Sequence, residues 1–186
     1  MTAARAATVL LAGALLVAGC GGSGPEPGFV TRDCCWRLRL VMGLLDDMRD
    51  NRRLRPLAGR EFILQTAAAI PAENEEVDLM VFCCRGDPLA PERNDRSRLY
   101  CSFLGPDAET AERFVRCELS EPVILIGDGF GEDGATTAHS HRNTVLVLWS
   151  DRRMEEIRVD RIAGYGTPGF RIGPGCPDAR FSHLCR

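Results

Sequence analysis

The sequence contains no lysine, so all 23 of its basic residues are arginine. Aspartate and glutamate together number 26, which leaves a formal net charge of −3 at neutral pH. Domains that bind nucleic acid are usually clearly basic, so this balance argues against a nucleic-acid partner. The sequence also lacks a G-x-S-x-G elbow, an H-E-x-x-H zinc helix and a glycine-rich phosphate loop. We therefore expect a protein that is not an enzyme, with an exported enzyme of unrecognised type as an alternative.

The apolar run at residues 6–18 is too short to cross a bilayer as a helix, but it has the length of a signal-peptide core. It ends in Leu16-Val17-Ala18-Gly19-Cys20, the pattern of a lipoprotein cleavage site. We therefore expect residues 1–19 to be a signal peptide and Cys20 to carry the lipid, including palmitate. The mature protein would then be anchored in the inner or outer membrane of the cell envelope, facing the periplasm or the exterior. An ordinary secretory signal with a chance cysteine is the alternative.

No Cys-x-x-Cys pair occurs among the cysteines that follow Cys20. A metal cluster bound by these cysteines is one interpretation, but two Cys-Cys dipeptides are poorly spaced for tetrahedral metal coordination. An even number of cysteines in an exported chain favours a disulfide framework, although the sequence does not give the pairing. The candidates are Cys34, Cys35, Cys83, Cys84, Cys101, Cys117, Cys176 and Cys185.

The spacing of apolar residues divides the chain into helices first and strands afterwards. Residues 20–30 are rich in glycine and proline and are expected to form a tether, followed by one domain at 31–164. An amphipathic helix is expected at 32–50 and a shorter one at 60–69. The apolar stripe expected on the first helix consists of Leu38, Val41, Met42, Leu45 and Met48. Five short runs are expected to be strands, at 77–83, 99–103, 122–126, 144–149 and 154–159, with a helical turn at 108–115. This order predicts an α+β fold in which one long helix packs on an antiparallel sheet. The tail at 165–186 is expected to be irregular and held by Cys176 and Cys185.

The segment from His141 to Ile157 resembles the C-terminal H-X9-D-G signature of bacterial prepilin-like proteins, relatives of the type II secretion pseudopilins. Nine residues separate His141 from Asp151, and Asn143 precedes the apolar strand. Four earlier segments resemble pieces of the same family in the family's order, at residues 35–51, 81–88, 100–105 and 122–128. The resemblance implies a pseudopilin-like headgroup and a link to a secretion or pilus-like assembly.

The chain departs from that family in its leader and in its signature. A lipobox and tether stand in place of the prepilin leader and the apolar half of the pilin helix, so we expect a headgroup on a lipid anchor rather than a pilus subunit. Arg152 stands where the signature has glycine. An Asp-Gly pair favours a tight hairpin with positive φ, and arginine in that conformation costs about 1 kcal/mol. We therefore expect a relaxed or longer turn.

The loop from Asp128 to His141 is the candidate ligand site. Asp128, Glu132 and Asp133 offer carboxylates to a hard cation such as calcium, which takes six to eight oxygen ligands. Some pseudopilins hold calcium in a comparable loop. The resemblance therefore supports an alternative function, that of a lipoprotein that binds a cation or another ligand through this loop. His139 and His141 are an alternative pair for zinc. The simpler interpretation is a solvated acidic turn, with His141 placed beside its hairpin for structural reasons.

Arginines also gather near the end of the first helix, at Arg49, Arg52, Arg53 and Arg55. They are candidates for contact with anionic membrane headgroups, or for simple complementation of the helix C-terminus. Trp36, Phe82 and Trp149 are expected to lie in the core. The sequence as a whole predicts a structural or interaction module of the cell envelope.

Overall fold

The structure, a computed structural model, describes residues 29–70, 79–84, 87, 90–128, 144–168 and 170–185, with side chains from Asp33 onward. The expected signal peptide, the acylated Cys20 and the tether up to residue 28 lie outside these residues. The same holds for five loop residues expected to be ligands or signature positions: Glu132, Asp133, His139, His141 and Asn143.

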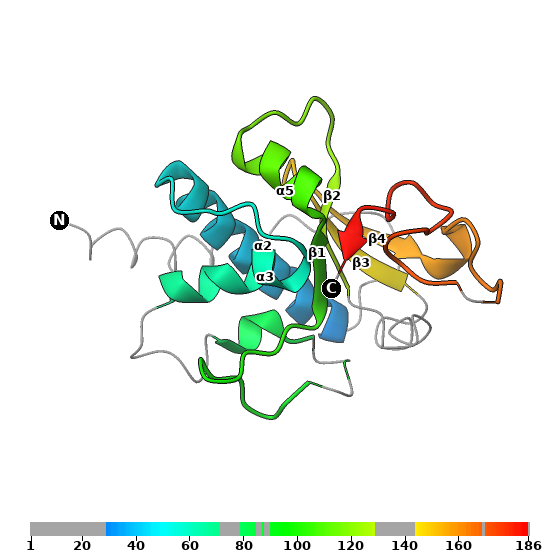
Figure 1. Cartoon of the computed structure of the whole chain (residues 1–186). Coiled ribbons are helices and arrows are strands. Elements are labelled where there is room, and N and C mark those ends of the chain that lie inside the picture. The colour runs from blue at the N-terminus through cyan, green and yellow to red at the C-terminus, as the bar shows by residue number, and fades with distance from the viewer. Residues whose placement is uncertain are drawn as a thin grey trace.

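The chain forms an α+β fold with one antiparallel sheet, which confirms the expected fold class (Figure 1). The five strands lie in the order β4-β3-β2-β1-β5. The helices are α2 (Phe29–Asp50), α3 (Gly59–Leu64) and α5 (Ala108–Val115), with 3₁₀ helices η2 (Gln65–Ala69), η4 (Leu79–Phe82) and η6 (Val159–Arg161). The strands are β1 (Phe103–Pro106), β2 (Ile124–Asp128), β3 (Thr144–Trp149), β4 (Met154–Arg158) and β5 (Leu184–Cys185).

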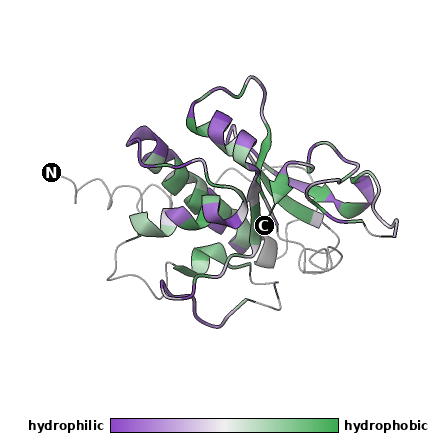
Figure 2. Ribbon diagram, viewed as in Figure 1, coloured by the Kyte–Doolittle hydropathy of each residue, from purple (hydrophilic) through white to green (hydrophobic). Residues whose placement is uncertain are grey.

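The helix α2 covers the sheet through its apolar side. All five side chains of the expected stripe are buried, and they join one core cluster with side chains of β2 and β3. Removing a leucine-sized side chain from water stabilises a fold by about 1.5–3 kcal/mol, so this stripe is a major source of stability. Figure 2 shows hydrophobic residues on α2 and on the strands, with polar residues concentrated at the ends and outer surfaces. The stripe consists of Leu38, Val41, Met42, Leu45 and Met48.

The end of α2 is closed by backbone hydrogen bonds rather than by glycine. Arg52 has a positive φ of 56°, the left-handed conformation that usually ends such a helix at glycine. The amide of Arg53 donates to the carbonyl of Met48 at 2.7 Å, and that of Arg52 donates to Arg49 at 2.9 Å. These two bonds satisfy carbonyls that the helix leaves open, and they direct the chain toward α3.

The segment expected to be the first strand is helical instead. Residues 79–82 form the 3₁₀ helix η4, in which Leu79, Val81 and Phe82 are buried. A short apolar run cannot be assigned to strand or helix by periodicity alone, which explains the error. The next expected strand, at 99–103, overlaps β1 only at Phe103. Ahead of it, Asn94 holds the chain by donating to the carbonyls of Leu79 and Tyr100, both at 2.9 Å.

The later elements agree better with the sequence. The expected bounds of α5 and β3 match those observed, and β4 ends one residue before its expected end. The strand β2 lies two residues further along than expected, because its buried run continues through Gly127 and Asp128. The Asp107 side chain caps α5 by accepting a hydrogen bond from the amide of Thr110 at 2.8 Å.

The C-terminal tail supplies a strand and part of the core, which its glycine- and proline-rich sequence did not indicate. Phe181 and Leu184 are fully buried in a second cluster with β3 and β4 side chains. The strand β5 pairs with β1, and a ring nitrogen of His183 lies 2.6 Å from the carbonyl oxygen of Ile124. The tail therefore closes one edge of the sheet.

The strand β1 approaches α3 so closely that only glycine fits there. A Cβ atom added at Gly105 would lie 2.0 Å from the carbonyl oxygen of Gly59. Gly59 itself has a positive φ of 59°, which glycine adopts without the cost borne by other residues. These two glycines fix the distance between α3 and the sheet.

Trp36 does not lie in the core, contrary to the expectation from the sequence. Its side chain is 45% exposed, on the side of α2 away from the apolar stripe, whereas Phe82 is fully buried and Trp149 is partly buried. In the part of the chain that the structure describes, no helix combines the length and the hydrophobicity needed to cross a membrane.

Candidate functional site

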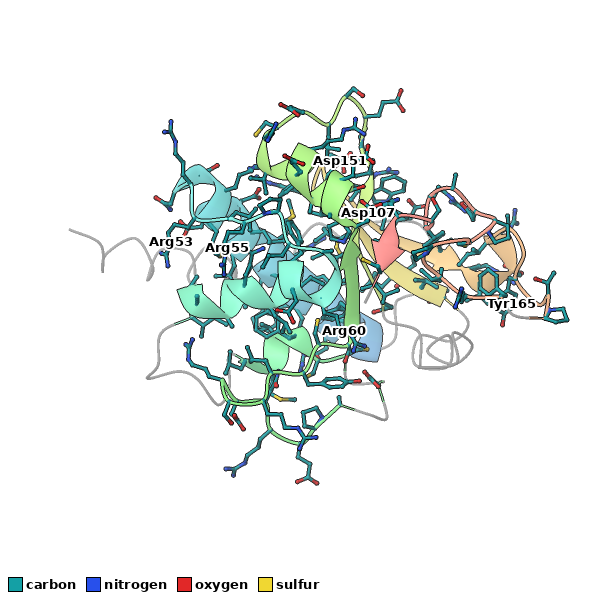
Figure 3. All side chains as sticks on the ribbon, in the orientation of Figure 1. Arg53, Arg55, Arg60, Asp107, Asp151 and Tyr165 are labelled. Carbon is teal, nitrogen blue, oxygen red and sulfur yellow. The ribbon has the colours of Figure 1, made fainter. Side chains whose placement is uncertain are left out.

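An arginine-lined pocket lies between the end of α2 and the helices α3 and η2. Its volume is about 390 Å³, and its walls include apolar side chains from all three elements. Arg53, Arg55 and Arg96 contribute three positive charges, and no carboxylate of the described residues lines it. Figure 3 shows Arg53 and Arg55 near each other beside these helices. The pocket is lined by Met48, Arg53, Arg55, Leu64, Gln65, Ala67, Ala68, Arg96 and Leu99.

Two side chains, those of Gln65 and Arg96, hold the walls of the pocket in place through hydrogen bonds. The Gln65 side chain accepts a hydrogen bond from the amide of Arg55 at 2.9 Å and donates to the Arg55 carbonyl at 3.0 Å. The Arg96 guanidinium donates to the carbonyls of Ala67 at 3.0 Å and Ile70 at 2.5 Å, at the end of η2. The backbone of Arg55 and the side chain of Arg96 are therefore fixed, and the charge of Arg96 is held at the pocket lining.

The sequence indicated only part of this arginine group. Arg49 does not belong to the pocket, because its guanidinium pairs with Asp46 at 2.8 Å and lies 4.6 Å from the ring centre of Phe114. Arg96 was missed, because it is far from the end of α2 in sequence and no local pattern marks it. Arg53 and Arg55 are exposed, and neither has a carboxylate partner among the described residues.

The expected cation loop is described only at its first residue. Asp128 is the last residue of β2 and is 4% exposed, and its Oδ2 accepts a hydrogen bond from the amide of Leu146 at 2.9 Å. This contact ties β2 to β3 at the point where the loop begins. Within the described ranges, no three His, Cys, Asp or Glu side chains gather in a metal-binding group. The calcium and zinc assignments for this loop stay predictions.

The hairpin that carries Asp151 has the longer turn that the sequence favoured. The amide of Arg152 donates to the carbonyl of Trp149 at 2.9 Å, and the amide of Trp149 donates to the carbonyl of Arg153 at 2.8 Å. These bonds enclose a three-residue loop, Ser150 to Arg152, of the kind that ends with a left-handed residue. Arg152 is that residue, with a φ of 70°. The strain of positive φ therefore remains, at the position where the signature has glycine.

Arg152 ties the hairpin tip to α2. Its guanidinium lies 2.8 Å from the carboxylate of Asp46, which also pairs with Arg49. Burial raises the pKa of the Asp46 carboxyl above its ordinary value, although both arginines act in the opposite direction. The contact connects the outer hairpin of the sheet to the helix that covers its face.

Five cysteines lie in the core where α2 meets the segment after η4. Cys34 and Cys84 bring their sulfur atoms within 3.0 Å of each other. Burial raises the pKa of the Cys83 thiol to about 11 and that of Cys101 to about 12, so both thiols are protonated at neutral pH and are poor nucleophiles. The five core cysteines are Cys34, Cys35, Cys83, Cys84 and Cys101, and all are thiols in the structure. The wider disulfide framework stays a prediction.

Comparison with protein families, curated proteins and solved structures finds no match.

The remaining three cysteines lie apart from this group. Cys117 is exposed and follows α5, with a φ of 58°. Cys176 is buried in the second core cluster, and burial raises its pKa. The Cys185 thiol in β5 lies 3.5 Å from the carbonyl oxygen of Pro106. The expectation that Cys176 and Cys185 hold the tail through disulfides stays a prediction.

The raised pKa of Asp46 predicts a pH-dependent stability difference. The folded-state pKa of Asp46 is above the unfolded value. Its contribution to the free energy of unfolding is therefore fully present below about pH 4 and is lost as the pH rises through the folded-state pKa. We expect the unfolding free energy of the wild type, minus that of Asp46→Asn, to fall as the pH is raised from 3 to 7. Urea denaturation at a series of pH values measures it.

Asp178→Asn is the matched control, because hydrogen bonding from Arg180 lowers the pKa of Asp178. Its contribution is present above the unfolded pKa and is lost as the pH falls, so the corresponding difference should rise with pH. Slopes of the same sign for both variants would contradict the account of Asp46.

Proposed function

We propose that this chain is a non-catalytic, lipid-anchored protein of the bacterial cell envelope that acts as a structural or interaction module. The lipobox pattern ending at Cys20 and the even number of later cysteines support export. The high pKa values of the buried Cys83 and Cys101 thiols disfavour these residues as nucleophiles.

The observation that carries the interaction role is the arginine-lined pocket. Three guanidinium groups lie beside apolar side chains in its lining, and neither Arg53 nor Arg55 has a carboxylate partner among the described residues. Arginine forms strong charge-assisted hydrogen bonds with phosphate oxygens, which suits a ligand that combines an anionic group with an apolar part. An anionic phospholipid has this chemistry, and a protein acylated at Cys20 stands next to such headgroups.

A second candidate role is that of a headgroup related to the pseudopilins, linked to a secretion or pilus-like assembly. The arrangement that favours it is the packing of α2 on an antiparallel sheet, together with the β3–β4 hairpin that turns at Asp151. The ion pair between Arg152 and Asp46 joins these two parts. This candidate rests on the arrangement and on the resemblance of the segment from His141 to Ile157.

The membrane anchor is tested by Cys20→Ser. We expect the variant to lose metabolically incorporated palmitate, because the Cys20 thiol is the attachment point for the diacylglyceryl group. Cys117→Ser is the control, since Cys117 is exposed and should not affect acylation. Retention of the acyl label in Cys20→Ser would contradict the lipoprotein assignment.

The headgroup-binding role is tested on the non-acylated mature chain with lipid vesicles. Each arginine near an anionic surface contributes roughly 1 kcal/mol, so Arg53→Gln with Arg55→Gln should weaken binding to phosphatidylglycerol vesicles by roughly 30-fold. Binding should also fall with added salt and be absent on phosphatidylcholine vesicles. Co-sedimentation measures each of these effects.

The control variant is Arg113→Gln with Arg171→Gln, which removes the same charge from exposed positions outside the pocket. A loss as large as that of the pocket variant would show that net charge, and not the pocket, attracts the vesicles. Inorganic phosphate in a competition arm distinguishes binding of the phosphate group alone from binding of the lipid.

A further inference from the structure

Two cysteines far apart in the chain meet inside the core. Cys34 in α2 and Cys84 after η4 are separated by 50 positions, and their sulfur atoms lie 3.0 Å apart. A disulfide bond is about 2.05 Å long, so a shift of about 1 Å between the two sulfurs would close it. Both side chains are buried, at 0% and 3% exposure.

The surrounding contacts keep the two segments in this position. Arg37, one turn after Cys34, donates to the carbonyl of Met80 and, at 2.7 Å, to that of Cys83. The amide of Cys84 donates to the Ser102 hydroxyl at 2.9 Å. The backbone on each side is therefore held by interactions that do not involve the sulfurs.

The neighbouring cysteine has different partners. The Cys83 sulfur lies 3.6 Å from the Asn94 amide nitrogen and 4.0 Å from the carbonyl oxygen of Tyr100. In the Cys83-Cys84 dipeptide, the sulfur of Cys84 lies against Cys34 and the sulfur of Cys83 lies against Asn94.

We infer that Cys34 and Cys84 form a disulfide bond in the mature protein. The inference rests on the proposed export, because disulfides persist in oxidising compartments. Each thiol loses a proton and an electron as the bond forms, and a protein disulfide of an exported thiol oxidase accepts both electrons and both protons and becomes a dithiol. Because both sulfurs are buried in the folded protein, the exchange takes place before α2 packs against the segment after η4.

The bond would close a large loop and so restrict the unfolded chain. It would also join α2 covalently to a segment that otherwise depends on Arg37 and Asn94 for its position. The covalent link therefore secures the helix that covers the sheet.

The test is a peptide map of the chain purified from its own cells, with thiols blocked at lysis and no reductant. Cys34 and Cys84 each have a cysteine neighbour, so a cross-linked peptide of the wild type would not show which cysteine is paired. The map is therefore made on the double variant Cys35→Ser with Cys83→Ser. We expect a cross-linked peptide pair containing Cys34 and Cys84. The matched variant Cys34→Ser with Cys83→Ser, which keeps Cys35, should lack it. In unreduced protein, Cys84→Ser should lower the melting temperature by about 10 °C, and Cys83→Ser should lower it much less.

A second arm separates the pairing from the proposed export. The same protein is reduced and then oxidised with glutathione disulfide. A link in both arms supports the inference. A link only after oxidation in vitro shows that the two cysteines can pair but overturns the disulfide of the mature protein, and it speaks against export. The absence of a link in vitro overturns the pairing itself, whatever compartment holds the protein.

Discussion

The burial of the apolar side of α2 against the sheet is the interaction on which the rest of the fold depends. Leu38 and Leu45 are fully buried in a cluster that includes Leu125 of β2 and Leu146 of β3. Most of the stability of a helix in a protein comes from the tertiary packing of its apolar side, so packing and not intrinsic propensity keeps α2 in place. The helix in turn positions the groups that give the protein its chemistry.

Those groups lie at the two ends of α2. Near its start, Cys34 faces Cys84, and Arg37 binds the carbonyl of Cys83. Near its end, Asp46 receives Arg152 from the hairpin tip, and the chain then turns so that Arg53 and Arg55 reach the pocket. A rotation of α2 about its axis would move the sulfur contact, the ion pair and the pocket together. These features therefore share one structural cause.

The sequence predicted the parts of this arrangement that depend on local pattern. The helical spacing of Leu38 to Met48 predicted α2, and the apolar, turn-bounded run before Asp151 predicted β3. The short run at 77–83 was assigned wrongly as a strand, because the periodicity of a short apolar run does not distinguish a strand from a 3₁₀ helix such as η4. Contacts between distant segments could not be read from the sequence at all. Arg96 in the pocket, the approach of Cys84 to Cys34 and the pairing of β5 with β1 are of this kind.

Native-state hydrogen exchange tests the central claim most directly. If α2 and the sheet form one cooperative core, the amides of Val41 to Leu45 should open with nearly the same free energy as those of Val145 to Leu148. Both sets should then respond equally to low concentrations of denaturant. Exchange of the α2 amides at a free energy several kcal/mol lower than that of β3 would show that the helix is not part of the core, and the account would be wrong.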